Sequence, residues 1–167
     1  MIAKKTKFVN PIKKAYYKNC MALISNKKIG RDYQITETYT AGIELFGFEV
    51  KSLQKSQGSL EGSFVTVRGK EAFVIGTFIP PYQENNTPKE YDPYRNRKLL
   101  LTKKEIEELG KIEKTKGLTI APVSVYNKGK YIKIDIGIAK GKKKFDKRET
   151  LKKKDTKRDL EREFKDR

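Results

Sequence analysis

The chain has 167 residues, of which 36% are hydrophobic and 36% are charged, with no histidine and a single cysteine. This composition excludes an apolar segment long enough to span a bilayer, an internal disulfide, a multi-cysteine zinc site and histidine-dependent catalysis. The net charge of +18, from 39 basic and 21 acidic residues, favours a polyanionic partner, above all a nucleic acid. An acidic membrane surface is the weaker alternative, and we expect a cytoplasmic protein.

The basic charge is concentrated at the two ends of the chain. Residues 1–31 hold nine basic and no acidic side chains, residues 140–167 carry a net +7, and residues 32–139 carry only +2. The near-neutral part also contains the long apolar stretches and is large enough for one core. We expect a basic extension at 1–24, a folded barrel at 25–139 and a basic tail at 140–167.

Two interpretations of the N-terminal extension remain open. It lacks a sustained apolar segment and a small-residue cleavage pattern, so it does not resemble a signal peptide. Either translation starts at Met21, or residues 1–20 form a disordered basic extension. Cys20 has no histidine or second cysteine to activate it, so we expect an inert thiol.

Alternating and β-branched residues predict strands through the middle of the chain. The expected strands are 33–39, 43–48, 63–68, 71–75, 118–126 and 131–139, the last four forming two hairpins. The first strand is expected to end at Thr40-Ala41-Gly42. Gly47 interrupts the second strand and suggests a bulge there.

One helix is predicted clearly, because Thr102 and Glu105 have the spacing of a capping box. Ile106, Leu109 and Ile112 follow at helical spacing, and Gly117 is placed to end the helix. A shorter helix is expected at 50–57, ended by Gly58, and a loop is expected at 80–88. These elements predict a mainly β fold with flanking helices, a small antiparallel barrel of the oligonucleotide-binding (OB) type.

The sequence contains no recognisable catalytic constellation. Gly141-Lys142 resembles the end of a phosphate loop, but Ile136 stands where the first glycine is needed and Lys143 where a serine or threonine is needed. Acidic residues are scattered, and Asp135 is expected at the surface of the last strand. We therefore expect no enzymatic activity, no cofactor and no metal site.

The basic run at 140–148 contains five lysines, one arginine and a single aromatic residue, Phe145. Lysines neutralise phosphates, and Phe145 either stacks on an unpaired base or packs back on the barrel. Residues 151–167 have no substantial apolar face, although acid-to-base pairs four residues apart favour a helix weakly. We expect a tail that is disordered in isolation and becomes helical against RNA.

Three motifs resemble those of the small protein B (SmpB) family, the bacterial tmRNA-binding proteins, and they occur in the same order along the chain as in that family. The first motif comprises Asn26-Lys27-Lys28, Asp32-Tyr33 and the stretch from Ala41 to Leu53. The second comprises Asp92-Pro93 and Arg95 to Leu101, and the third comprises Gly137 to Lys143 with Asp146-Lys147-Arg148. The resemblance extends from about residue 25 to the end of the chain.

The resemblance implies an OB barrel, without catalytic activity, that binds the tRNA-like domain of tmRNA. It implies a role in trans-translation, which rescues stalled ribosomes and tags their nascent chains for degradation. The tail is implied to enter the decoding centre, formed by 16S rRNA, and the empty mRNA channel. Elongation factor Tu and alanyl-tRNA synthetase are implied as indirect partners through tmRNA, and the chain is expected to be a monomer.

The resemblance also assigns roles to particular residues. The implied tmRNA-facing positions are Asn26, Lys27, Lys28 and Lys133. Predicted RNA contacts, with a structural polar role as the alternative, are Lys51, Arg95 and Arg97. The ribosome-facing segment starts at the junction, Lys140, Gly141, Lys142 and Lys143, and continues through Phe145, Asp146, Lys147 and Arg148.

Two positions depart from the family pattern. Thr40 stands where the family often has a glutamate that contributes to RNA binding, and Phe145 replaces the usual histidine or tyrosine. Phe145 keeps a stacking face and loses the polar atom. The main alternative function is a ribosomal or other structural rRNA-binding protein, and the second is an RNA-processing enzyme. The missing histidine and the lack of a carboxylate cluster argue against the enzyme.

Overall fold

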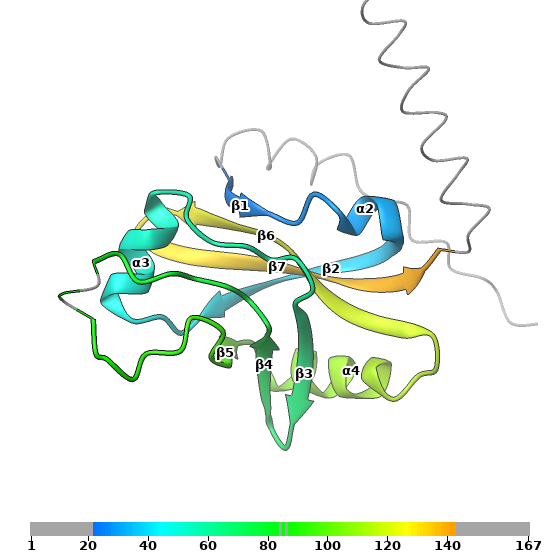
Figure 1. Ribbon diagram of the computed structural model, residues 1–167. Helices are drawn as coiled ribbons and strands as arrows, with labels where there is room; N and C mark the ends of the chain where they lie inside the picture. The colour runs from blue at the N-terminus through cyan, green and yellow to red at the C-terminus, as the bar shows by residue number, and fades with distance from the viewer. Residues whose placement is uncertain (1–21, 84, 86, 143–167) are drawn as a thin grey trace, which may run out of the picture.

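The computed structural model describes residues 22–83, 85 and 87–142. Within these residues the chain forms a seven-stranded antiparallel sheet in the order β1-β6-β7-β2-β5-β4-β3 (Figure 1). The sheet is strongly curled. This is shown by β3, which lies against β6 although the two strands are not hydrogen-bonded neighbours in the sheet. This arrangement confirms the expected mainly β, antiparallel barrel with flanking helices.

Three short elements join the predicted ones. The two expected hairpins and the helix after Thr102 are confirmed, whereas β1, α2 and β5 were not predicted. The elements are β1 (Ala22–Ser25), α2 (Ile29–Asp32), β2 (Tyr33–Ile43), α3 (Gly47–Gln54), β3 (Phe64–Arg68), β4 (Glu71–Ile75), β5 (Arg97–Leu100), α4 (Lys103–Glu113), β6 (Leu118–Lys128) and β7 (Tyr131–Gly141).

The expected break at Thr40-Ala41-Gly42 is wrong, because β2 continues through these residues. Ala41 pairs with Ile134 and Gly42 pairs with Lys133 on β7, while Gly42 also pairs with Leu100 on β5. Hydrogen-bonded pairing with β5 on one side and β7 on the other thus keeps Gly42 in the strand, although glycine weakens a strand interior. Long-range pairing decides the conformation of this segment.

The expected strand at 43–48 is also wrong, because α3 begins at Gly47. Glu49 caps this helix: its carboxylate accepts a 2.7 Å hydrogen bond from the backbone amide of Phe46. The helix ends at Gln54, earlier than predicted, and Ser56 and Gly58 adopt positive φ angles of 57° and 138° in the turn that follows. Leu53, buried on α3, packs into the core.

One main hydrophobic core fills the interior of the curled sheet. The helices α3 and α4 contribute Leu53 and Leu109 to this core. Burial of each such aliphatic side chain contributes roughly 1.5–3 kcal/mol. The buried members are Ile24, Ala41, Leu53, Leu60, Val65, Ala72, Val74, Ile79, Leu99, Leu109, Ile120, Val125, Ile134 and Ile136.

Asp135 is not at the surface, contrary to expectation. It is 1% exposed, and its Oδ1 atom accepts hydrogen bonds from the Thr40 hydroxyl at 2.7 Å and the Tyr126 hydroxyl at 3.2 Å. Side chains alternate along β7, so Asp135 lies on the opposite face from Ile134 and Ile136. The carboxylate therefore joins β2, β7 and β6 on the face of the sheet that points away from the main core, where it is still buried. Thr40, the departure from the family pattern, is one of its partners.

Candidate RNA-binding surface

Asn26 organises the chain between β1 and α2. Its Nδ2 atom donates to the carbonyl oxygens of Leu60 and Pro122 at 3.2 and 3.3 Å, and its Oδ1 atom accepts from the amide of Ile29 at 3.2 Å. The carboxamide therefore ties three segments together. Asn26 therefore positions the two basic residues that follow it in the chain.

Those neighbours, Lys27 and Lys28, are exposed. The Nζ atom of Lys28 lies 2.6 Å from a carboxylate oxygen of Glu61, and both side chains are about half exposed. Such a surface ion pair is worth at most about 1 kcal/mol, so Lys28 can exchange Glu61 for a phosphate at low cost.

Lys142 reaches the same corner of the molecule from the far end of the sequence. Its amide donates to the carbonyl of Asp32 at 3.0 Å, and its Nζ atom donates to the carbonyl of Gly30 at 2.8 Å. The end of β7 is thus attached to α2. The structure brings Asn26, Lys27, Lys28 and Lys142 together at one corner, which we call the α2 corner.

Two aromatic side chains lie in the same hollow as Lys28 at the α2 corner. A surface hollow of about 340 Å³ is lined there by Asn26, Lys28, Tyr33 and Phe64, among others. Both aromatic residues are exposed. Cations beside exposed aromatic rings are the combination that binds the phosphates and bases of single-stranded nucleic acids.

Lys133 and Lys140 occupy the two ends of β7. Lys140 is exposed near the α2 corner, and Gly141 pairs with Tyr33. Lys133, roughly 23 Å away along the strand, lies opposite Gly42. A Cβ atom at Gly42 would lie 3.1 Å from the Cβ of Leu100, which is exposed. Lys133 and Leu100 therefore flank a position with room for little more than a glycine.

Arg97 lies wholly inside the protein, with a side-chain exposure of 0%. Its five N–H donors all have protein acceptors: Glu49 Oε1, the hydroxyl of Tyr91, and the carbonyls of Thr77, Pro93 and Arg95. A guanidinium that is saturated in this way has no donor left for a phosphate. The structure places Arg97 in the structural role that the sequence left open.

Arg95 binds the same carboxylate from the surface side. Its Nε and Nη2 atoms donate to the two carboxylate oxygens of Glu49 at 2.9 and 2.6 Å. Burial disfavours the charged form of Glu49, but the hydrogen bonds from Arg95 and the amide of Phe46, with the charge of Arg97, outweigh it and lower the pKa of the carboxyl group. Glu49 is therefore ionised in the folded protein.

Tyr91 completes this network: its hydroxyl, which has a single proton to donate, lies within hydrogen-bond distance of two acceptors, Glu49 Oε1 at 2.9 Å and the carbonyl oxygen of Ile79 at 2.8 Å. Burial and the neighbouring Glu49 carboxylate raise the pKa of Tyr91 to about 12. Lys51, on the exposed face of α3, lies with its Nζ atom 5.9 Å from the centre of the Tyr82 ring. Lys51 remains accessible to a partner.

The remaining predicted residues, Lys143, Phe145, Asp146, Lys147 and Arg148, lie outside the described residues. In the part of the chain that the structure describes, no group of three or more cysteine, aspartate or glutamate side chains is arranged to hold a metal ion. Nor is any helix there long and apolar enough to cross a membrane.

These features define a class of protein: a small antiparallel β-barrel with basic and aromatic side chains on its surface, the architecture used by many nucleic-acid-binding domains. The SmpB protein family model matches residues 23–166. The chain belongs to the SmpB family, a family of RNA-binding proteins.

Individual relatives agree with this assignment. The SsrA-binding protein of Elusimicrobium minutum is 48% identical over 141 residues, covering 84% of this chain and 89% of that protein. The SsrA-binding protein of Latilactobacillus sakei subsp. sakei is 46% identical over 150 residues, covering 90% of this chain and 96% of that protein. A chain from the solved structure "tmRNA-SmpB: a journey to the center of the bacterial ribosome" is 40% identical, with a TM-score of 0.62 over 72% of this chain and 85% of that one.

Proposed function

We propose that this protein binds tmRNA, also called SsrA RNA, and acts with it on stalled ribosomes in trans-translation. The observation that carries the proposal is family membership over residues 23–166, with curated relatives whose names state SsrA binding. In this proposal the barrel binds the tRNA-like domain of tmRNA. The tail at 140–167 enters the decoding centre and the empty mRNA channel, so that the nascent chain is tagged for degradation.

The geometry supports a binding role. The α2 corner presents Lys28 in the same hollow as the exposed rings of Tyr33 and Phe64, and Lys133 adds a cation at the other end of β7. The two fully buried carboxylates among the described residues have structural roles: Glu49 caps α3 and binds two arginines, and Asp135 joins three strands. We therefore propose a cytoplasmic, non-catalytic monomer whose links to elongation factor Tu and alanyl-tRNA synthetase run through tmRNA.

The decisive experiment is recovery of the RNA bound to the full-length chain in a bacterial cell that lacks its own SsrA-binding protein. The tagged chain is purified from lysate, and the bound RNA is sequenced. Recovery of tmRNA as the dominant species is the expected result. Recovery of ribosomal RNA alone, with the chain in every ribosome, would favour a constitutive ribosomal protein and refute the proposal.

A further inference from the structure

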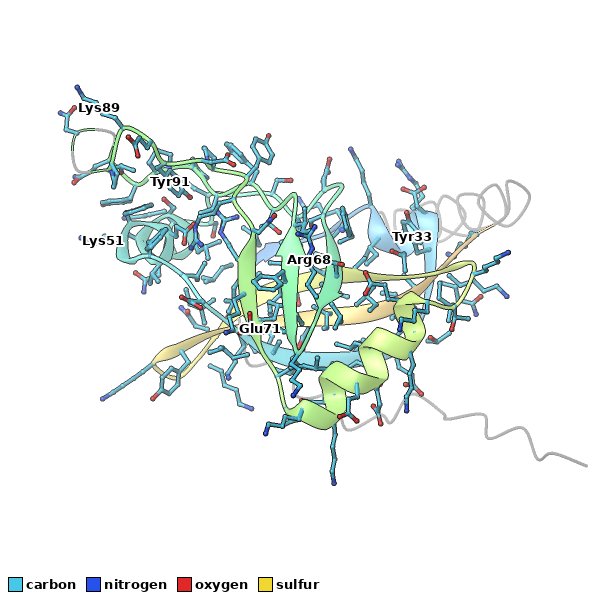
Figure 2. The ribbon with its side chains drawn as sticks, turned by 90° about the horizontal axis from the view of Figure 1, so that it is seen from below. Tyr33, Lys51, Arg68, Glu71, Lys89 and Tyr91 are labelled. Atoms are coloured by element: carbon cyan, nitrogen blue, oxygen red, sulfur yellow. The ribbon has the colours of Figure 1, made fainter. Side chains whose placement is uncertain are left out.

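A groove runs along α4 on the side that faces the turn between β3 and β4. In Figure 2, α4 lies beside the hairpin that these two strands form. The groove has a volume of about 700 Å³, and its lining includes Val67 and Lys70 from the hairpin and Lys103, Ile106 and Gly110 from α4. We call it the α4 groove. Its length along the helix is roughly 16 Å, or about three turns.

The surface of α4 has a gap at Gly110. Residues four positions apart form ridges on a helix, and Gly110 stands between Ile106 and Lys114 in one of these ridges. Glycine is among the least favourable residues in a helix interior. Gly110 does not adopt a positive φ angle, and a Cβ atom there would lie 3.7 Å from Val67 Cγ1, an ordinary contact. Neither the backbone nor the packing therefore requires this glycine, and its effect is to leave a gap that a side chain of a second helix can enter.

Glu113 holds the two sides of the α4 groove together. Its carboxylate accepts hydrogen bonds from the hydroxyl of Thr66 at 2.6 Å and from the amide of Val67 at 3.0 Å. These bonds attach the end of α4 to β3, while Leu109 on another face of the helix is buried in the main core. The groove is therefore formed before any partner binds, which reduces the entropy lost on binding.

The rim of the α4 groove is mainly positive. Its lining contains four lysines whose ammonium groups make no hydrogen bond or ion pair within the part of the chain that the structure describes: Lys70, Lys103, Lys111 and Lys114. The lining also contains the carboxylates of Glu107 and Glu113, and the second of these is already bonded to β3. The groove thus offers cations around a floor that contains the aliphatic side chains of Val67 and Ile106.

This lining favours a protein partner over RNA. Unpaired bases bind by stacking on aromatic rings, and no aromatic side chain of the described residues lines the α4 groove, in contrast to the hollow at the α2 corner. The exposed Glu107 lies among the lysines and would repel a backbone in which every unit carries a negative charge. A peptide can place acidic side chains opposite the lysines and a neutral one opposite Glu107.

The charge of the chain argues that the partner is a different protein. Residues 1–31 carry nine basic and no acidic side chains, residues 140–167 carry a net +7, and the whole chain carries +18. Because like charges repel across an interface, neither end of this chain nor a second copy suits a groove lined by lysines.

We propose that the α4 groove binds an amphipathic, acidic helix of another protein. Such a helix lays its apolar face into a groove and uses anchors at i, i+3, i+4 and i+7. One aliphatic side chain of the partner enters the gap at Gly110, and acidic side chains beside it pair with Lys103 and Lys111. The inference adds a protein contact to the proposed function and does not rest on it.

The test measures binding of a peptide to the full-length chain by fluorescence anisotropy at one salt concentration. The probe is a fluorescein-labelled synthetic peptide of about four helical turns, with leucines at the anchor spacing and glutamates at the flanking positions. The comparison peptide has the same composition in an order that no longer places the leucines on one face. We expect the ordered peptide to bind more tightly, because both peptides have the same charge and only the first has an apolar face.

Gly110→Leu fills the gap without changing the charge. We expect it to weaken binding of the ordered peptide roughly 10- to 100-fold, through loss of one buried aliphatic contact. Gly47→Leu is the matched control, because Gly47 is an exposed glycine outside the groove at which a Cβ atom meets nothing within 4 Å. Leucine is favoured over glycine in a helix, so thermal melts should show no loss of stability for Gly110→Leu.

A pair of double variants tests the lysines. Lys103→Gln with Lys111→Gln should weaken binding by up to about fivefold for each lysine. Lys104→Gln with Lys116→Gln removes the same charge from exposed positions outside the groove and should have a smaller effect. Equal affinity of the two double variants, of Gly110→Leu and Gly47→Leu, or of the two peptides would overturn the inference.

Two further outcomes are distinguishable. If Gly110→Leu weakens binding of the tRNA-like domain of tmRNA and leaves peptide binding unchanged, RNA occupies the groove and the inference is overturned. If the chain recovers no tmRNA from cells but binds the ordered peptide in a manner that depends on Gly110, the proposed function fails and the α4 groove stands.

Discussion

Glu49 and Arg97 form an ion pair in which both side chains are fully buried and the Nη2 and Oε1 atoms are 2.8 Å apart. Placing two charges in the interior is costly, and the cost is offset only when every remaining donor and acceptor is satisfied. Here Tyr91, Arg95 and the amide of Phe46 complete the set around Glu49. The pair connects α3 to the first residue of β5.

Glu49→Gln should destabilise the protein by about 3–5 kcal/mol, because it leaves the charge of Arg97 buried without a counterion. Urea unfolding followed by circular dichroism measures this loss. Glu71→Gln is the matched control: Glu71 also pairs with a cation, Lys98, but both side chains are partly exposed. We expect it to cost at most about 1 kcal/mol. Equal stability of the two variants would contradict the assigned role of the buried pair.

Stability should fall in acid because of the same carboxylate. The pKa of Glu49 is lower in the folded chain than its usual value of 4.5, so the unfolded chain binds this proton more readily. The stabilisation is complete above that usual value and is lost as the pH falls through the folded pKa. Melting temperatures measured from pH 6 to pH 2 should decline below the usual carboxyl range, in Glu71→Gln as in the unaltered chain. A flat profile across that range would show that Glu49 is not held ionised by its partners.

Gly137→Ala should destabilise the barrel by about 1–3 kcal/mol through overpacking. A Cβ atom there would lie 2.9 Å from Ile35 Cγ2 and 3.2 Å from Val123 Cγ2. Gly141→Ala, on the same strand, meets no atom within 4 Å and serves as the control. Thermal melts should separate the two variants, and an unchanged melting temperature for Gly137→Ala would show that the strands can move apart at this point.

Replacing Lys27 and Lys28 together by alanine should weaken binding to the tRNA-like domain of tmRNA and reduce its salt dependence. Each lost phosphate contact lowers the slope of log K against log salt by about 0.7–0.9. The control replaces Lys103 and Lys104, another exposed adjacent pair, at the start of α4. Filter binding at several salt concentrations gives the slopes. Identical slopes for the two double variants would remove the α2 corner from the RNA-binding surface.

Local signals were sufficient for much of the fold. The hairpins follow from alternating residues around short glycine turns, and α4 follows from its capping box, in which the Thr102 amide donates to Glu105 Oε2 at 2.9 Å. The family motifs located the lysines at the α2 corner, but not the contact that brings Lys142 to Gly30.

The errors fall where distant partners decide the outcome. Nothing near Gly42 indicates that β5 and β7 will hold it in a strand, and nothing near Asp135 indicates that Thr40 and Tyr126 will enclose it. The sequence shows that Arg97 is charged, but only the fold shows the buried acceptors that surround it. For the same reason the sequence does not show which aromatic rings stay exposed, since the exposure of a ring such as that of Tyr94 is a property of the folded chain.

The two hydrogen bonds from Lys142 to α2 have a consequence for chain geometry. They fix the point at which the chain leaves the barrel, beside Lys27 and Lys28. Each residue after that point adds about 1.5 Å of reach as a helix or about 3.3 Å when extended. Consider an RNA bound at the α2 corner and a second partner bound by a residue after Lys142. The greatest distance between these two partners is then set by the number of residues between Lys142 and that residue. Inserting or deleting residues directly after Lys142 would lengthen or shorten that distance in known steps.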